Sequence, residues 1–168
     1  MTPAQEMLKG ACGQCVDQEY PKETLLEIAA GMNPSLHDSW QKLADTGWLG
    51  IVIPEEFGGE GGSLTDAGVL FEELGRGPVP GPHLSSGVLS ALMVLEGGSS
   101  QQKSDWSPRL ANGTDLLIPA ITESDYGWYE DDVTANLTSS GEDWMLNGKT
   151  AYVFHGSCAT LSLKTLWP

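Results

Sequence analysis

The order of helical and strand-like patterns constrains the fold of this chain more than any other feature. Helical patterns with caps and glycine stops fill the first two thirds, and strand-like patterns with turn signals follow after Asn112 and Gly113. A parallel sheet with crossover helices would alternate the two patterns instead. The order therefore predicts an α+β chain, with an N-terminal all-α helical domain over residues 1–113 and a partial antiparallel β-domain over 114–168.

Apolar periodicity and helix-ending residues predict the individual elements. The expected helices cover 3–18, 22–31, a segment capped by Asn33 or Ser35 and ended by Gly47, 64–74, 84–95, and a segment capped by Ser99 or Ser100 and ended by Gly113. The expected strands cover 115–122, 132–140, 143–148 and 150–156. So few strands leave sheet edges exposed, which natural proteins avoid. We therefore expect an incomplete β-domain and a truncated chain.

Four glycines lie within the stretch FGGEGGS, residues 57–63. The apolar run WLGIVIP before it predicts a strand, and Ser63 with Asp66 predicts a capped helix after it. A strand, a glycine loop and a helix in this order are typical of a phosphate site. However, the stretch matches neither Gly-x-Gly-x-x-Gly nor a loop that ends in Gly-Lys-Ser or Gly-Lys-Thr. The sequence therefore favours a tight turn with positive φ and close backbone approach.

The charge of the chain excludes two classes of partner. The 168 residues carry 8 basic and 23 acidic side chains, a net charge of −15, which repels nucleic acid and anionic membrane surfaces. No signal-peptide pattern and no membrane-spanning apolar run occur, so we expect no membrane insertion. Three cysteines are too few for a disulfide framework and suit a reducing compartment, which favours a cytoplasmic location.

Cys12 and Cys15 form a Cys-x-x-Cys pattern, which redox pairs and half zinc sites share. A zinc site needs two further ligands, but Cys158 is distant in sequence and the three histidines are scattered. The pair shares an apolar helical face with Leu8 and Val16. We therefore expect two core residues and no metal site, with redox chemistry as the less favoured alternative.

Five short motifs occur together along the chain: Gly-Trp-Leu-Gly at 47–50, Pro-Glu-Glu-Phe-Gly-Gly at 54–59, Glu-Glu-Leu-Gly-Arg at 72–76, Ile-Thr-Glu at 121–123 and Leu-Asn-Gly-Lys at 146–149. In this order and at this spacing they resemble the acyl-CoA dehydrogenase family over nearly the whole chain. The first part resembles the N-terminal helical domain of that family, and the rest resembles the opening of its middle β-domain. In that family the glycine-rich stretch connects two helices, and the cofactor phosphates are held elsewhere.

The resemblance implies a flavoprotein oxidoreductase of fatty acid metabolism that binds FAD and removes two hydrogens from the Cα–Cβ bond of an acyl-CoA thioester. In the family a carboxylate takes the weakly acidic α-proton while the flavin takes the β-hydride. That carboxylate belongs to a C-terminal helical domain that these residues do not match, so no catalytic residue is assigned and the chain alone is expected to be inactive.

The resemblance also implies partners. They are an acyl-CoA substrate, an electron acceptor such as an electron-transfer flavoprotein, and further subunits in a homo- or hetero-oligomer. The alternative is a non-catalytic binding or assembly module that pairs with a full-length acyl-CoA dehydrogenase.

Six cofactor-binding residues follow from the same resemblance, in two strands that contact the flavin: Ala120, Ile121 and Thr122 in the first, and Tyr152, Val153 and Phe154 in the second. The Thr122 hydroxyl would bond the polar edge of the ring, and Tyr152 would offer a flat face. Chemistry alone favours an ordinary strand residue at Thr122 and a core aromatic at Tyr152. The apolar helix over 84–95 could wall a substrate channel, but a core helix is favoured.

Overall fold

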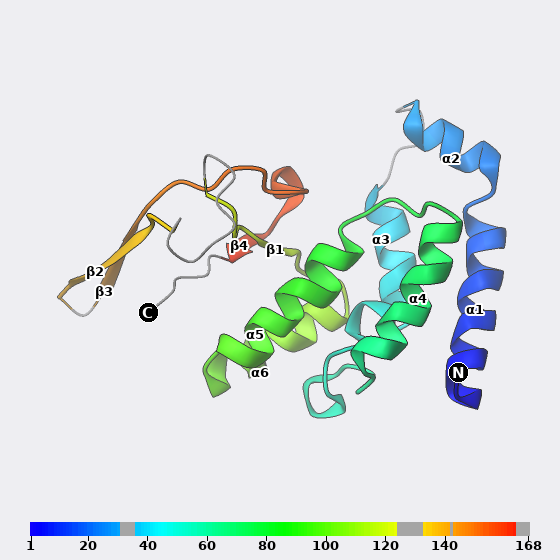
Figure 1. Cartoon of the computed structure of the whole chain (residues 1–168), viewed down its shortest axis with the longest axis horizontal. Helices are drawn as coiled ribbons and strands as arrows, with labels where there is room; N and C mark the ends of the chain where they lie inside the picture. Colours follow the sequence, from blue (N-terminus) through cyan, green and yellow to red (C-terminus); the bar gives the residue numbers. More distant parts are fainter. Residues whose placement is uncertain (31–35, 124–132, 142, 164–168) are drawn as a thin grey trace.

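The computed structural model describes residues 1–30, 36–123, 133–141 and 143–163 (Figure 1). Its α-helices lie together in one part of the molecule, and a two-stranded hairpin projects away from them. The helices are α1 (Pro3–Glu19), α2 (Lys22–Ala29), α3 (Leu36–Asp45), α4 (Leu64–Arg76), α5 (Ala91–Gly97) and α6 (Ser100–Ala111). The predicted order, with helices first and strands after, is confirmed. The expected caps Asn33 and Ser35 lie outside the described residues.

Three of the described helices begin with a reciprocal cap of the kind that the sequence predicts at Ser63. The Ser63 backbone N donates to Asp66 Oδ2 at 2.7 Å, and the Asp66 backbone N donates to Ser63 Oγ at 3.3 Å. Hydrogen bonds from Ser63 lower the pKa of the Asp66 carboxyl to about 2. Such bonds satisfy backbone donors that the first turn of a helix leaves without partners. The other two caps start α1 and α6, at Thr2 with Gln5 and at Ser99 with Gln102.

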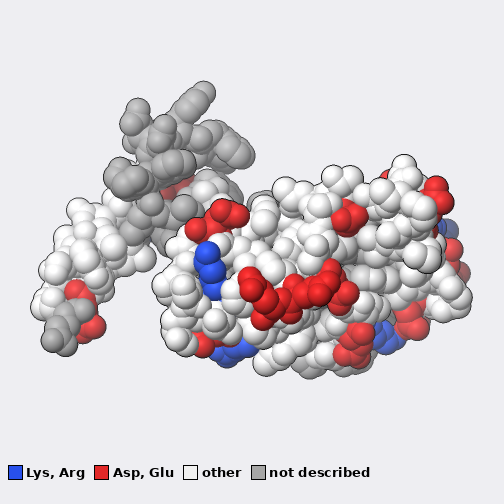
Figure 2. Space-filling view, turned by 90° about the horizontal axis from the view of Figure 1, so that it is seen from below, with Lys and Arg blue, Asp and Glu red and all other residues white. Residues whose placement is uncertain are grey.

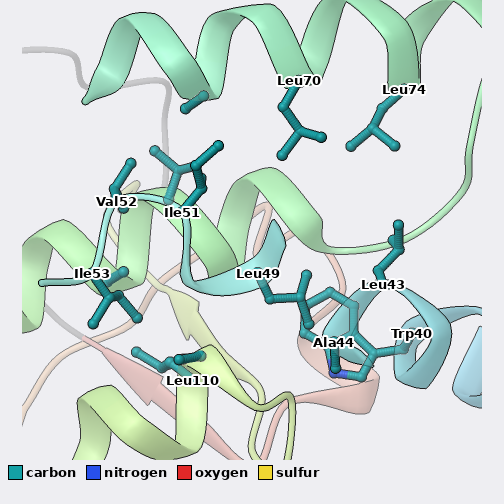
Figure 3. Packing of buried hydrophobic residues seen from close by; sticks show 14 of the residues in the cluster. Trp40, Leu43, Ala44, Leu49, Ile51, Val52, Ile53, Leu70, Leu74 and Leu110 are labelled. Carbon is teal, nitrogen blue, oxygen red and sulfur yellow. The ribbon is translucent and has the colours of Figure 1, made fainter. Parts of the chain in front are cut away.

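The core of the helical part lies between α3, α4, α6 and the apolar run that follows α3 (Figure 3). Leu70 and Leu74 point from α4 toward Leu43 of α3 and Leu49. Each of these four side chains is 2% exposed. Burying a leucine fully is worth about 1.5–3 kcal/mol relative to leaving it in water. This cluster therefore fixes the positions of α3 and α4 around the apolar run.

The apolar run 51–53 does not form the predicted strand, but continues as turns after the 3-10 helix η1 (Trp48–Gly50). The reason lies in the glycine-rich stretch, which runs back along it. Gly61 N donates to Ile53 O, and Gly62 N donates to Ile51 O, each at 2.8 Å. Because these carbonyls already have partners, the run needs no neighbouring strand.

Gly58 and Gly59 show why this stretch contains glycine. Gly58 follows the 3-10 helix η2 (Glu55–Phe57) and has a φ of 79°, in the left-handed region. A Cβ atom built on Gly59 would lie only 2.2 Å from Ile53 O. The predicted turn with positive φ and close backbone approach is confirmed, and it leads directly into α4.

Gly59→Ala should lower the thermal midpoint of unfolding, because its methyl group would push the glycine stretch away from Ile53. Overpacking of this kind costs about 1–3 kcal/mol. Gly68→Ala is the matched control, because Gly68 lies within α4 and a Cβ there meets nothing within 4 Å. Alanine is favoured over glycine inside a helix by roughly 0.5–1 kcal/mol, so the control should melt no lower than the parent. Melting curves by circular dichroism compare the three, and an unchanged midpoint for Gly59→Ala would contradict the close contact.

Two side-chain contacts tie the helical part to the start of the strands. Trp40 Nε1 donates to Gly113 O at 2.9 Å. Arg109 Nε lies 2.5 Å from the buried Asp115 carboxylate, in an ion pair. The Asp115 side chain is 7% exposed and the Arg109 side chain 46%, so a half-exposed guanidinium balances a buried carboxylate at the junction. The division into domains at residue 113 stays a prediction.

The described strands form two small sheets. β2 (Asn136–Ser140) and β3 (Asp143–Asn147) make an antiparallel hairpin whose residues are all exposed. This hairpin confirms the predicted antiparallel pairing. β1 (Leu117–Pro119) instead pairs in parallel with β4 (Leu161–Leu163), a strand that the sequence did not predict. The β1–β4 pair lies between the hairpin and the helices (Figure 1).

Residues 150–156 do not form the predicted strand. Thr150 makes a single isolated antiparallel bridge with Glu123. Tyr152 and His155 then have φ values of 55° and 60°, in the left-handed region. An extended strand requires negative φ, so the segment bends at both residues. The second flavin strand expected from the resemblance is therefore a bent segment in this structure.

The apolar segment 84–95 forms two helical pieces instead of one buried helix. The first, η3 (His83–Ser90), is a π-helix, and α5 follows it directly. Val88 and Val94 are each 6% exposed, but Leu84 and Leu89 are 51% and 41% exposed. The segment therefore has one core face and one open face, and the expectation of burial on all sides was wrong.

His83 begins η3 and stacks on Phe71 of α4, with ring centroids 5.5 Å apart. Burial of the imidazole, together with the nearby His155, lowers the pKa of His83 from 6.5 to about 4. A partly buried imidazole that resists protonation makes the stability of the fold depend on pH.

The free energy of unfolding should therefore fall as the pH falls from 6.5 to about 4. In this window the unfolded chain binds a proton at His83 and the folded chain does not, so protons favour unfolding. The full loss is about 3 kcal/mol. His83→Gln removes this titration, so urea titrations at several values of pH should show a shallower pH dependence than the parent shows. Equal slopes for the two proteins would contradict the lowered pKa.

Candidate functional site

A cavity of about 340 Å³ lies where η3, the residues that follow β1 and the segment 151–154 meet. Each of these three segments contributes to its wall. The lining consists of Ser85, Leu89, Pro119, Ile121, Thr122, Ala151, Tyr152 and Phe154. The candidate site is this cavity, because it combines segments that are far apart in the sequence.

Backbone contacts hold the three segments together. β1 packs against η3. Ala120, just after β1, donates its N–H to Leu163 O of β4 at 2.6 Å. Two residues farther on, Thr122 O accepts from Ala151 N at 2.9 Å. Strand pairing of β1 with β4, packing of β1 on η3 and one hydrogen bond to the bent segment 151–154 thus hold the cavity wall together.

The lining is apolar and aromatic with a few hydroxyl groups. Tyr152 and Phe154 are 60% and 76% exposed, so both aromatic residues lie largely at the surface of the cavity. Thr122 and Ser85 add hydroxyl groups that donate and accept hydrogen bonds. Among the residues that the structure describes in this lining, none carries a charged or catalytically basic side chain. Such a cavity suits a flat, largely apolar ligand with a polar edge, and it provides no acid or base.

The cavity brings together residues from both segments that the sequence singled out. Ile121 and Thr122 from the first and Tyr152 and Phe154 from the second lie in its wall. Ala120 is instead buried at 4% exposure. Val153 is likewise not part of the described lining, because the chain bends at Tyr152. The assignment of all six residues to a flavin stays a prediction.

Sequence reasoning named the wall of a channel only as the less favoured role for the segment 84–95, which contains most of η3. Ser85 and Leu89 line the cavity, yet their segment was expected to be a core helix. The signal was weak, because an apolar helix facing a cavity looks the same in sequence as one facing the core. The open face of the segment, marked by Leu84 and Leu89, becomes visible only when β1 is placed against η3.

Cys12 of the Cys-x-x-Cys pattern is buried in the core. The Cys12 side chain is fully buried between α1 and α4, and burial raises its pKa to about 12. A thiol that stays protonated is a poor nucleophile and a poor metal ligand, which supports the core interpretation. The residues that the structure describes contain no group of three or more ligating side chains able to hold a metal ion.

One face of the helical part is acidic (Figure 2). Figure 2 shows a band of acidic side chains across the helical part of one face, with few basic ones among them. Within the described ranges, no helix combines the length and the apolar character needed to cross a membrane. Because the lining residues carry no positive charge either, phosphate groups would need backbone N–H donors or residues outside the lining.

Comparison with known proteins gives a consistent result. Residues 2–114 match the sequence model of the family described as "Acyl-CoA dehydrogenase, N-terminal domain". The (2S)-methylsuccinyl-CoA dehydrogenase of Cereibacter sphaeroides is 33% identical over 118 residues, which cover 70% of this chain and 22% of that protein. The acryloyl-CoA reductase (NADH) of Anaerotignum propionicum is 30% identical over 162 residues, 95% of this chain and 41% of that protein.

A solved structure matches the fold over nearly the whole chain. It is the glutaryl-CoA dehydrogenase of Mycobacterium smegmatis in complex with FADH2, with a TM-score of 0.84 and 24% sequence identity. The match covers 99% of this chain and 42% of that one. The present chain therefore spans less than half of the length of these relatives.

Proposed function

We propose, because the chain belongs to the acyl-CoA dehydrogenase family, that it forms part of the flavin site of an enzyme that removes two hydrogens from the Cα–Cβ bond of an acyl-CoA thioester. The observation that carries this proposal is the cavity, whose wall unites Ile121 and Thr122 with Tyr152 and Phe154. The family resemblance singles out these four residues, and the cavity lining brings them into one wall.

FAD is the cofactor that we propose for this cavity. When bound, it supplies the hydride acceptor of the reaction. The residues present fit its flat and largely apolar ring: Tyr152 and Phe154 add aromatic surface, and Leu89 and Ile121 add aliphatic surface. The Thr122 hydroxyl fits a polar atom at the edge of the ring.

The base that removes the α-proton lies outside the described cavity wall. A thioester α-proton is only weakly acidic and needs a positioned carboxylate or similar base, which none of the lining residues supplies. The proposed role of this chain is therefore to bind and orient, and another part of the enzyme supplies the base.

These 168 residues alone should not oxidise an acyl-CoA. A positioned base contributes about 10²–10⁴-fold to the rate, and orientation of the thioester contributes more. The assay is acyl-CoA-dependent reduction of an artificial electron acceptor with added FAD. Turnover near ordinary enzyme rates, on the order of 10 per second, would show that these residues contain a base.

The proposed partners follow from the reaction. Reduced flavin must pass its electrons on, so we propose an electron acceptor such as an electron-transfer flavoprotein, together with a homo- or hetero-oligomeric assembly in the cytoplasm. The substrate class is an acyl-CoA.

The β2–β3 hairpin favours a second candidate function, that of a non-catalytic module which pairs with a full-length family member. Trp144, Met145 and Leu146 of β3 are 67%, 53% and 50% exposed. Exposed apolar surface of this kind is typical of an interaction site. A colourless protein that co-purifies with a larger dehydrogenase would favour the module, and flavin absorption in the purified chain would favour the enzyme part.

Thr122→Val should weaken flavin binding without unfolding the protein, because it removes one hydroxyl from the cavity wall while keeping the shape of the side chain. The loss of one hydrogen bond to a neutral ring is worth about 0.5–1.5 kcal/mol, roughly a 2- to 10-fold higher Kd. Thr138→Val on the exposed hairpin is the matched control. Flavin fluorescence titrations measure the Kd of the parent and of both variants. An unchanged Kd for Thr122→Val would show that the Thr122 hydroxyl plays no part in flavin binding.

A further inference from the structure

We infer that Glu123 is a positioning residue, whose carboxylate clamps the chain just before β2 to the segment that carries Ile121 and Thr122. The inference rests on the proposed function in one respect, because it assigns the clamp to the wall of the proposed flavin cavity. Glu123 itself does not line the cavity, so it acts through its neighbours.

The Glu123 carboxylate is buried and accepts several hydrogen bonds. Glu123 is only 4% exposed. One carboxylate oxygen accepts from Thr134 N at 2.6 Å and from Thr134 Oγ1 at 2.5 Å, and the other accepts from Ala135 N at 3.0 Å. A buried carboxylate is costly unless it is hydrogen-bonded, and bonds to a charged acceptor are about twice as strong as neutral ones. The Glu123 side chain therefore binds the backbone of Thr134 and Ala135, which lie eleven and twelve residues farther along the chain.

The backbone of the same residue extends the clamp to the second half of the cavity wall. Glu123 forms the isolated antiparallel bridge with Thr150. Directly beside it, Thr122 O accepts from Ala151 N at 2.9 Å. Thr122 and Ala151 both line the cavity. The hydrogen bond between them lies at the Glu123–Thr150 bridge, so the backbone of Glu123 is paired directly beside the cavity wall.

The segment before β2 is also in contact with the residues that precede Thr150. A Cβ atom built on Gly148 would lie 2.6 Å from Ala135 Cβ, so the two backbones are very close. The position of Ala135 is thus linked to the wall from two sides, by the Glu123 carboxylate and by the approach of Gly148. Releasing the carboxylate should loosen the whole junction and not only one bond.

Glu123→Gln tests the clamp with almost no change in shape. A glutamine offers one acceptor oxygen and one NH2 group, which would face the Thr134 or Ala135 N–H, donor against donor. Amide hydrogen exchange by NMR should become at least about tenfold faster at Thr134 and Ala135, as expected for the loss of a charge-assisted bond. Exchange at Ala151 should rise as well, whereas the amides of α4 should not change.

Glu56→Gln is the matched control, because it makes the same chemical change at an exposed residue of η2 and should alter none of these amides. Unchanged exchange at Thr134 and Ala135 in Glu123→Gln would overturn the clamp. Faster exchange at these two amides without any change at Ala151 would overturn the positioning role. If Glu123→Gln does not fold, the milder Thr134→Val variant replaces it, with faster exchange at Ala135 and Ala151 expected and unchanged exchange as the contrary result.

A flavin titration of parent and variant separates this inference from the proposed function. If the parent binds FAD, Glu123→Gln should raise the Kd and change the visible absorption of the bound flavin, and an identical Kd and spectrum would overturn the positioning role. If the parent does not bind FAD, the proposed flavin site fails, while the exchange data at Ala151 still decide whether Glu123 positions the wall.

Discussion

The close contact between the glycine-rich stretch and the apolar run before it organises the helical part of this protein. Gly61 and Gly62 donate to the carbonyls of Ile53 and Ile51, and Gly59 lies directly against the Ile53 backbone. The contact turns the apolar run into a compact central segment, around which α3, α4 and α6 pack. Because η3 also packs on η1, this contact indirectly sets the place of the cavity. The packing of three helices thus depends on a glycine that lets two backbone segments approach closely.

The sequence predicted those parts of the fold that local signals specify. The helices and the cap at Ser63 follow from short-range hydrogen bonds and periodicity, which are visible in the sequence. The strand expected over 48–54 was wrong, because β-branched residues are compatible with any buried segment, and the partner of residues 51–53 is a glycine loop. The strand expected over 150–156 was wrong because Tyr152 and His155 have positive φ, which no residue type there signals.

The candidate site was predictable in part for a similar reason. Ile121, Thr122, Tyr152 and Phe154 were found through motifs, because a resemblance carries tertiary information that periodicity lacks. Leu89 was not found, because its exposure depends on where β1 packs against η3. The parallel pairing of β1 with β4 was missed as well, since it joins residues more than forty positions apart. Non-local packing therefore decided each of the missed features.

The described lining of the cavity carries no charged side chain, whereas Glu123, which holds neighbouring segments together, is a buried carboxylate. The described wall offers rings, aliphatic groups and hydroxyls, whereas the buried Glu123 carboxylate accepts hydrogen bonds from Thr134 and Ala135. A carboxylate without hydrogen-bond partners in the apolar wall would have to lose its hydration, which is costly. It would also repel any other negatively charged group close to it. Engaging Glu123 in the framework keeps the wall neutral and still gives it rigidity. In the proposed function, a wall of this kind orients a planar cofactor, and proton removal is assigned to a base outside the described wall.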